Sequence, residues 1–244
     1  MHRILVETSA LSAVEPTLTE QARRHLKVVR PKEGEPVELF DGKGRWRLYS
    51  FSGGNVVASG EICSDDRAER PVLVLFACVT KGSRWDWTIE KATELGVTRV
   101  VPVISDRTIV RIPAAERNCK RERWFRIAED AARQSDAKWL PDVVAPVDFA
   151  EAVAMAGECD CYVGALTDPA PPPMLAALES ARPSGRARPL AVFVGPEGDF
   201  TPEELSSLLA VSTPVSFGPT ILRAETAAIY GLGVAKAWMD SHEV

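Results

Sequence analysis

The stretch GPTILRAETAA, residues 218–228, follows an apolar, strand-like run and opens what reads as a buried helix. It places two charged residues, Arg223 and Glu225, among residues typical of a protein core. Earlier in the chain, the strand-like run AVFV ends in a similar way, with GPEGDF at residues 195–200. Both neighbouring strands thus end in Gly-Pro, and a charged pair follows the second. This pattern is more typical of a functional site than of a protein core.

Apolar, β-branched runs alternate with helical stretches from residue 72 onward. The runs are VLVLFACV (72–79), RVVPVI (99–104), CYVGAL (161–166), LAVFVG (190–195) and TPVSFG (213–218). The helical stretches are RWDWTIEKATELG (84–96), ERWFRIAEDAARQS (122–135), FAEAVAMA (149–156), PEELSSLLA (202–210) and RAETAAIYGLGVAKAWM (223–239). This alternation predicts an α/β domain with a parallel sheet and helices on both faces. Ligands of such sheets bind at the carboxyl ends of the strands, where both Gly-Pro turns lie.

Residues 1–63 read instead as a small β-rich unit. The runs PVELFDG (36–42), RWRLYSF (45–51) and NVVASGEI (55–62) are separated by glycine-containing turns typical of hairpins. A helix capped by Thr19 interrupts them, in TEQARRHLKVV at residues 19–29. The polar segment SDDRAERP, residues 64–71, reads as a linker. We therefore expect two domains, at residues 1–70 and 71–244.

Composition excludes several classes of protein. The longest uncharged apolar run, VLVLFACVT at residues 72–80, is too short for a bilayer, which takes about 20 residues. The N-terminal MHRILVETSA has no secretion-signal pattern, so we expect a cytoplasmic protein. The five cysteines contain no CxxC pair, which favours buried, reduced thiols over a metal site or disulfides.

The net charge of −5 is unevenly distributed along the chain. Residues 1–70 are balanced, residues 71–126 carry a net charge of +5, and residues 127–244 carry −10. A dense basic patch, RRHLKVVR, also lies at residues 23–30. These basic regions fit either a nucleic-acid surface or a solvated helix face, and composition alone does not decide between them.

The loop GPEGDF has features of a ligand-binding turn. Gly195 and Gly198 permit backbone conformations closed to other residues and let a ligand approach the main chain. No Gly-Lys-Ser/Thr or GxGxxG pattern is present, and Glu197 and Asp199 would repel a phosphate. The loop is therefore predicted to offer backbone groups to an uncharged or cationic ligand, with a purely structural turn as the alternative.

Two helix starts follow these turns. Thr201, Pro202 and Glu204 fit a capped helix with a capping box. Arg223 and Glu225 open the last helix and would face whatever binds at the strand ends, although a structural salt bridge is the alternative. GLGVAK, residues 231–236, lies within that helix and not after a strand, so it indicates close helix packing and not a dinucleotide site.

Taken together, GPEGDF and FGPTILRAETA resemble the C-terminal signature of the SPOUT superfamily, the trefoil-knotted methyltransferases. They are most similar to its RsmE branch, which methylates N3 of a uridine in 16S ribosomal RNA. KGSRWDWTIEKATELGV (81–97) and SDRT (105–108) match further motifs of that branch. HLKVVRPKEGEPVELFDGKG, residues 25–44, resembles its N-terminal PUA-like RNA-binding barrel.

The resemblance implies a knotted C-terminal domain whose two Gly-Pro turns close around S-adenosylmethionine. It implies a homodimer that acts on 16S ribosomal RNA, with no metal. The cofactor-binding residues it implies are Leu166, Val194, Gly195, Glu197, Gly198, Phe217, Gly218, Ile221, Leu222 and Thr226.

Catalytic roles are assigned as a hypothesis for methylation of N3 of a uracil. Arg223 is expected to stabilise negative charge on O2 or O4 of the uracil, Glu225 to orient Arg223, and Glu94 is a weaker candidate for the base. Both glutamates being structural is the alternative. A phosphate-contacting surface is expected from Arg23, Arg24, Lys27, Arg30, Lys43, Arg45, Lys81, Arg84 and Arg107.

The sequence also departs from the branch at two places. Asp199 stands where the branch has a second glycine, and this replacement need not affect the chemistry if the Asp199 backbone is not left-handed. DAARQSDAKWLP, residues 130–141, departs further and is assigned no catalytic role. Three other functions remain open: methylation of a ribose 2′-O, RNA binding without catalysis and, least favoured, nucleotide hydrolysis.

Overall fold

The computed structural model describes residues 1–65, 72–181 and 188–242. Most of the predicted linker, residues 64–71, lies outside the described residues. Contacts divide the chain into a smaller unit, residues 1–70 with 129–140, and a larger unit, residues 71–128 with 141–244. The segment 129–140, which the sequence assigned to the larger domain, therefore packs within the smaller unit.

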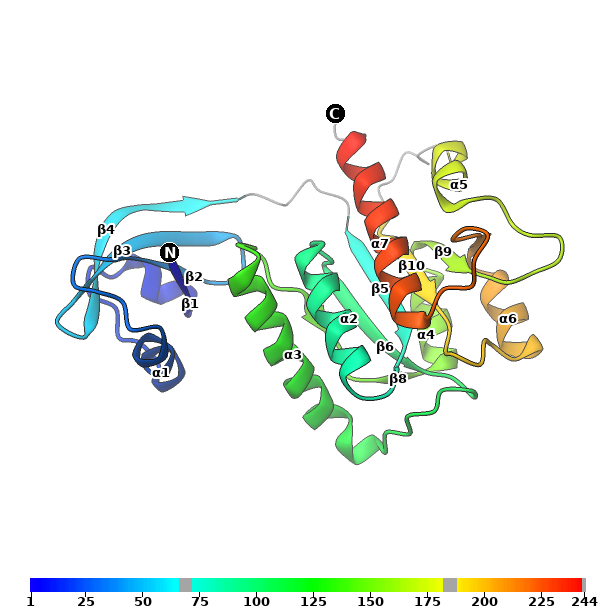
Figure 1. Cartoon of the computed structure of the whole chain (residues 1–244), viewed down its shortest axis with the longest axis horizontal. Coiled ribbons are helices and arrows are strands. Elements are labelled where there is room, and N and C mark those ends of the chain that lie inside the picture. The colour runs from blue at the N-terminus through cyan, green and yellow to red at the C-terminus, as the bar shows by residue number, and fades with distance from the viewer. Residues whose placement is uncertain (66–71, 182–187, 243–244) are drawn as a thin grey trace. The chain divides into compact units, whose positions relative to one another are not determined.

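The larger unit is built on a parallel sheet in the order β11-β9-β10-β5-β6-β7, with β8 also paired to β6. Figure 1 labels β5, β6, β8, β9 and β10 of this sheet. Its strands are β5 (Leu73–Cys78), β6 (Arg99–Ile104), β7 (Asp142–Val143), β8 (Val147–Asp148), β9 (Asp160–Gly164), β10 (Leu190–Val194) and β11 (Thr213–Val215). The five runs read as strands from the sequence are β5, β6, β9, β10 and β11. The two-residue strands β7 and β8 were not expected, because two residues carry no periodicity.

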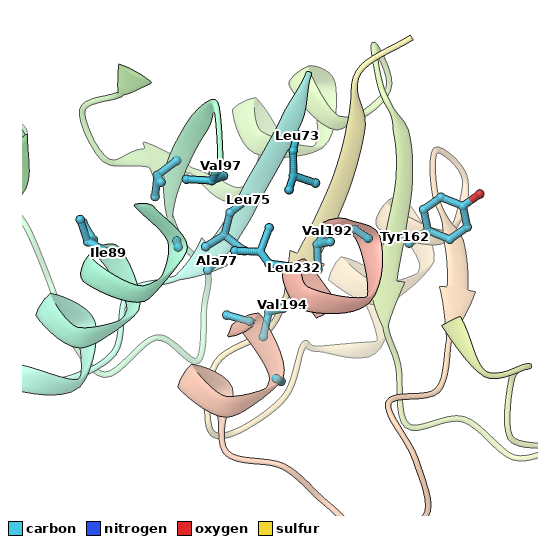
Figure 2. Close-up of a cluster of buried hydrophobic side chains, with 14 of the residues drawn as sticks. Leu73, Leu75, Ala77, Ile89, Val97, Tyr162, Val192, Val194 and Leu232 are labelled. Atoms are coloured by element: carbon cyan, nitrogen blue, oxygen red, sulfur yellow. The ribbon is translucent and has the colours of Figure 1, made fainter. Parts of the chain in front are cut away.

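Both faces of this sheet are buried, and strand β5 shows why. Leu73, Leu75 and Ala77 point into one hydrophobic cluster, whereas the alternate residues of β5 point into a second cluster. Helices α2 (Ser83–Glu94), α3 (Arg117–Gln134), α5 (Met174–Ser180) and α7 (Ala224–Ser241) contribute to the first cluster, and α4 (Phe149–Ala156) and α6 (Pro202–Leu209) to the second. Figure 2 shows part of the first cluster, where Leu232 of α7 lies beside Ala77 and Val192.

Gly231 in α7 has a different packing role from the one the sequence indicated. A Cβ atom at this position would lie 2.7 Å from Cγ1 of Val192 in β10 and 3.1 Å from the ring of Phe217. The glycine therefore lets α7 approach the sheet, and not another helix. A Cβ atom on Gly233, in contrast, would meet no heavy atom of the described residues within 4 Å.

The smaller unit contains a four-stranded sheet in the order β1-β2-β3-β4. Its strands are β1 (His2–Leu5), β2 (Pro36–Phe40), β3 (Arg45–Ser52) and β4 (Asn55–Ser64), and its helix is α1 (Glu20–Val29). Thr19 caps α1 by accepting a hydrogen bond from the Ala22 amide, as predicted. The strand β1 pairs parallel to β2, and an irregularity between Arg47 and Tyr49 interrupts the pairing of β3 with β4. Closure of this sheet into a PUA-like barrel stays a prediction.

Short 3-10 helices at Thr8–Ser12 and Ala114–Glu116 complete the regular elements that the structure describes. None of the helices in the described ranges is long and apolar enough to cross a membrane.

The prediction that the cysteines are buried was partly wrong. Cys78, Cys159 and Cys161 are buried, but Cys63 and Cys119 are exposed.

A buried ion network explains why segment 129–140 belongs to the smaller unit. Arg3 Nε lies 2.8 Å from a carboxylate oxygen of Glu38, and Lys138 Nζ lies 2.8 Å from both oxygens of that carboxylate. Arg3 also donates hydrogen bonds to the carbonyls of Ala132 and Ala137 at 2.7 and 2.9 Å. The side chains of Arg3 and Glu38 are only 5% and 3% exposed, so each charge depends on the others for solvation.

The substitution Glu38→Gln should therefore destabilise the smaller unit strongly. It leaves the buried Arg3 and the partly buried Lys138 without their shared carboxylate, so that the exposed Asp136 is the carboxylate that remains beside both. Loss of one partner costs about 3–5 kcal/mol in fully buried pairs, and we expect the lower end of that range here. Urea unfolding of the full chain measures the loss of stability. Hydrogen exchange of the β2 amides shows whether the loss lies in the smaller unit. Glu61→Gln, at an exposed position of β4, is the control and should change stability by less than about 0.5 kcal/mol.

Candidate active site

A cavity of about 300 Å³ lies at the carboxyl ends of β9, β10 and β11. Three segments that follow these strands form its walls, at residues 164–166, 194–199 and 215–224, and Ala227 of α7 completes the lining. Both Gly-Pro turns singled out in the sequence contribute to it. The prediction that the turns meet at one edge of the sheet is therefore confirmed.

Eight of the ten residues predicted to bind the cofactor line this cavity: Leu166, Val194, Gly195, Glu197, Phe217, Gly218, Ile221 and Leu222. Gly198 and Thr226 are not part of the lining. A Cβ atom on Gly198 would instead meet the side chain of Arg107 at 3.5 Å, and Thr226 is exposed on the first turn of α7. The sequence did not single out Ala165, Pro196 or Thr220 as lining residues, although each adjoins or lies between residues that it did single out.

The glycine loop is shaped differently from the sequence prediction. Neither Gly195 nor Gly198 has a positive φ, whereas Asp199 has φ of 58° and is left-handed. Asp199 occupies this conformation while its side chain accepts a hydrogen bond from the Phe200 amide at 2.8 Å. Gly195 is required for space, because a Cβ there would lie 3.0 Å from the ring of Phe200. Asp199 therefore has the left-handed backbone that glycine adopts more readily, so the condition under which its replacement of a glycine need not matter is not met.

The SDRT turn after β6 holds this loop in place. Arg107 donates hydrogen bonds to the carbonyls of Gly198 and Phe200, at 3.0 and 3.2 Å. The amide of Asp106 donates to Glu204 at 2.8 Å, and Glu204 also closes the predicted capping box with Thr201. Arg107 was predicted to contact RNA phosphate, but in this structure its guanidinium is engaged with the loop.

Arg84, at the start of α2, links the two turns electrostatically. Its guanidinium lies 3.8 Å from carboxylate oxygens of both Glu197 and Glu225. The Glu225 side chain is 11% exposed, and its second oxygen is buried without a hydrogen-bond partner. Glu225 was predicted to orient Arg223, but it pairs with Arg84 instead. Arg223, the N-cap residue of α7, lines the cavity and makes no ion pair with any described residue.

Glu94 is remote from the cavity. It ends α2, at the opposite end of the helix from Arg84, and its carboxylate accepts a hydrogen bond from Lys91 at 2.8 Å. It is not among the lining residues. The structure therefore gives Glu94 a surface ion pair and no place next to a ligand in this cavity.

The remaining residues of the predicted RNA surface are exposed. Arg23, Arg24, Lys27 and Arg30 lie on or just after α1, Lys43 and Arg45 lie just before and at the start of β3, and Lys81 precedes α2. Arg24 pairs with Glu20 one turn earlier on α1.

Cys78, at the end of β5, is not a nucleophile here, because burial raises the pKa of its thiol to about 12.

A match to a protein-family model shows the class of protein. Residues 68–236 match the family model described as the RNA methyltransferase domain. The larger unit is therefore an RNA methyltransferase domain, with the SPOUT-type α/β fold that the sequence predicted.

More specific relatives follow from matches over nearly the full chain. The chain is 31% identical over 245 residues to ribosomal RNA small subunit methyltransferase E of Synechocystis, covering 98% of this chain and 78% of that protein. It is 29% identical to the Bacillus subtilis protein of the same name, covering 95% and 94%. The chain belongs to the ribosomal RNA small subunit methyltransferase E family, the RsmE branch.

Solved structures agree. The Neisseria gonorrhoeae ribosomal RNA small subunit methyltransferase E, bound to S-adenosylmethionine, is 29% identical with a TM-score of 0.77, covering 99% of this chain and 97% of that one. A methyltransferase from Legionella pneumophila, in complex with the same cofactor, is 26% identical with a TM-score of 0.76, covering 97% and 96%.

The variant Arg107→Ala should loosen the glycine loop. It removes two hydrogen bonds from a charged donor, which are worth about 1.5 kcal/mol or more each when buried and less at this exposed site. Amide hydrogen exchange of Asp199 and Phe200 should accelerate by about tenfold. Arg111→Ala is the matched control, because Arg111 bonds only the Ser105 and Asp106 carbonyls of the same turn. Equal exchange rates of these amides in both variants would contradict the role of Arg107 in holding the loop.

Proposed function

We propose that this protein transfers the methyl group of S-adenosylmethionine to N3 of a uridine in 16S ribosomal RNA. The observation that carries the proposal is the cavity at the strand ends, formed by both Gly-Pro turns with Arg223 at its wall. Membership of the family supports the coarser activity, methylation of small-subunit ribosomal RNA. The choice of N3 of uridine rests on the motifs of the RsmE branch.

The lining residues fit S-adenosylmethionine. Leu166, Ile221 and Leu222 offer apolar surface to an adenine, and the loop backbones offer hydrogen-bonding groups. Glu197 and Asp199 suit a cationic ligand and would repel a nucleotide phosphate. When bound, the cofactor supplies a methyl group already activated by a positively charged sulfur. The residues that would hold it are the eight predicted residues that line the cavity.

Residues of the chain would then do two things for the substrate. The cavity walls would align the base with the methyl group, and alignment of two bound partners can lower a barrier by about 7–11 kcal/mol. Arg223 would place its positive charge near O2 or O4 of the uracil and stabilise the negative charge that develops as N3 releases its proton to solvent water. Because N3 is paired in a duplex, the uridine must be bound unpaired or flipped.

The smaller unit is proposed to bind the RNA backbone. Its basic residues Arg23, Arg24, Lys27, Arg30, Lys43 and Arg45 are all exposed. Phosphate contacts of this kind position a substrate and make binding dependent on salt. Arg84 and Arg107, which pair within the larger unit, are less available for phosphate than Lys81.

A homodimer is proposed as the working form. Leu166 and Ile221 at the cavity wall are 67% and 83% exposed, which is a large apolar exposure next to a binding site. A second copy covering these residues would bury them. Sedimentation velocity should give twice the mass of one chain, and a monomer at micromolar concentrations would contradict the proposal.

The variant Arg223→Ala should slow methyl transfer by about 10²- to 10³-fold while leaving cofactor affinity nearly unchanged. The arginine would act on charge that develops in the transition state, and removing one such donor costs about 10²- to 10³-fold in rate. Transfer is measured with radiolabelled S-adenosylmethionine on small subunits from a strain that lacks the gene. Normal turnover in this variant would end the assignment.

The activity itself is tested by nucleoside mass spectrometry of 16S ribosomal RNA from that deletion strain. Loss of 3-methyluridine, restored by the wild-type gene, supports the proposal. Loss of a 2′-O-methylated nucleoside would indicate ribose methylation instead, and an unchanged nucleoside profile would indicate RNA binding without catalysis.

Charge reversal at two positions of the smaller unit, Arg24→Glu with Arg30→Glu, should weaken RNA binding. Loss of two phosphate contacts should also reduce the dependence of affinity on salt, by a slope of about 2. Binding is measured by filter retention or fluorescence anisotropy at several salt concentrations. Cofactor affinity should be unchanged, and an unchanged RNA affinity would refute the proposed surface.

A further inference from the structure

The cavity has an acidic group, Glu197, whose effect on the choice between methyl donor and product goes beyond the proposed reaction. Arg84 lies 3.8 Å from Glu197 and 3.8 Å from Glu225, so one guanidinium is shared between two carboxylates. We propose that Glu197 is a specificity-determining residue. It makes the cavity favour the methyl donor, whose sulfur is positively charged, over the demethylated product, whose sulfur is neutral. This inference rests on the proposed function, because it takes S-adenosylmethionine as the ligand.

The charges of this triad do not cancel. Two carboxylates share one guanidinium, which leaves one net negative charge. Both separations exceed hydrogen-bonding distance, and Arg84 is the only ion-pair partner of Glu197 among the described residues. Glu197 is also the member of the triad that lines the cavity, and its side chain is 27% exposed. The uncompensated charge is therefore available to a ligand at the cavity wall.

The other charges in the cavity lining do not offset it. Asp199 and Arg223 are the remaining charged residues in the lining, and their charges are opposite. One carboxylate oxygen of Asp199 is already occupied by the Phe200 amide. The lining and the triad together thus carry one excess negative charge, while the cation beside the loop, Arg107, lies outside the lining, is exposed and is hydrogen-bonded to the Gly198 and Phe200 carbonyls.

S-adenosylmethionine and S-adenosylhomocysteine differ by the positive charge on the sulfur, with which the Glu197 carboxylate would interact. In methyl transfer the sulfur–carbon bond breaks, the sulfur keeps the bonding electron pair, and its positive charge disappears. S-adenosylhomocysteine is otherwise the same molecule as the donor. A nearby negative charge therefore strengthens binding of the donor relative to the product. Glu197 would contribute to this preference, and Arg84 would limit it.

The test uses the full-length protein and two ligands. Isothermal titration calorimetry gives Kd for S-adenosylmethionine and for S-adenosylhomocysteine, and the ratio of the two is the selectivity for the donor. Glu197→Gln should lower this selectivity by about 5- to 10-fold, the size expected for one charge in a partly solvated cavity. Arg84→Gln should raise it by a similar factor, because it removes the compensating charge. Raising the salt concentration should shrink both changes.

Two controls separate charge from fold damage. Glu203→Gln removes an exposed carboxylate from α6, outside the cavity lining, and should leave the selectivity unchanged. Arg84→Lys keeps the charge and should stay close to wild type in selectivity. Opposite changes in the two charge-removing variants support the inference, because a merely structural role would weaken both ligands alike.

The possible outcomes separate a failure of this inference from a failure of the proposed function. If the wild-type protein binds neither ligand, the proposed function fails. If it binds both, and Glu197→Gln leaves the selectivity unchanged or shifts it in the same direction as Arg84→Gln, only the role of Glu197 is overturned.

Discussion

Parallel pairing of β10 between β9 and β5 is the constraint on which the site depends. Leu190 to Val194 run in register with Leu73 to Ala77 on one side and, through Phe193, with Asp160 to Val163 on the other. Parallel strands bring all their carboxyl ends to one edge, so the segments after β9, β10 and β11 meet there although they are far apart in sequence. The burial of both sheet faces fixes this register, because a slip of one residue would exchange the two hydrophobic clusters.

Loops at such an edge need support, and here it comes from the ends of the two neighbouring strands. Arg84 follows β5 and Arg107 follows β6, and both reach the segment after β10. One holds a carboxylate by charge, and the other holds two carbonyls by hydrogen bonds. The cavity wall at 195–200 is therefore shaped by residues outside it. This explains why arginines that look like RNA contacts in the sequence are turned toward the protein.

The sequence predicted the elements well where the signal is local. The five main strands, the capped start of α6 at Thr201 and the opening of α7 at Arg223 follow from periodicity, glycine and proline placement, and capping chemistry. Eight residues predicted to bind the cofactor line one cavity because they lie in the segments at or after the ends of β9, β10 and β11.

Features that depend on distant pairing could not be read from the sequence. The partner of Glu225 is Arg84 and not its near neighbour Arg223, and segment 129–140 joins the smaller unit through Arg3 and Glu38. The left-handed backbone at Asp199 was also hidden, since only the branch pattern hinted that a glycine belongs there. The first two are decided by contacts between residues far apart in the sequence.

The central claim is that the three segments at the carboxyl edge bind S-adenosylmethionine. Hydrogen–deuterium exchange of the full chain with and without the cofactor tests it most directly. Protection confined to residues 164–166, 194–199 and 215–224 is the predicted result. The larger unit has a second cavity, next to Gly157 and Ser212. Protection there instead, or no protection at the three segments under saturating cofactor, would contradict the account.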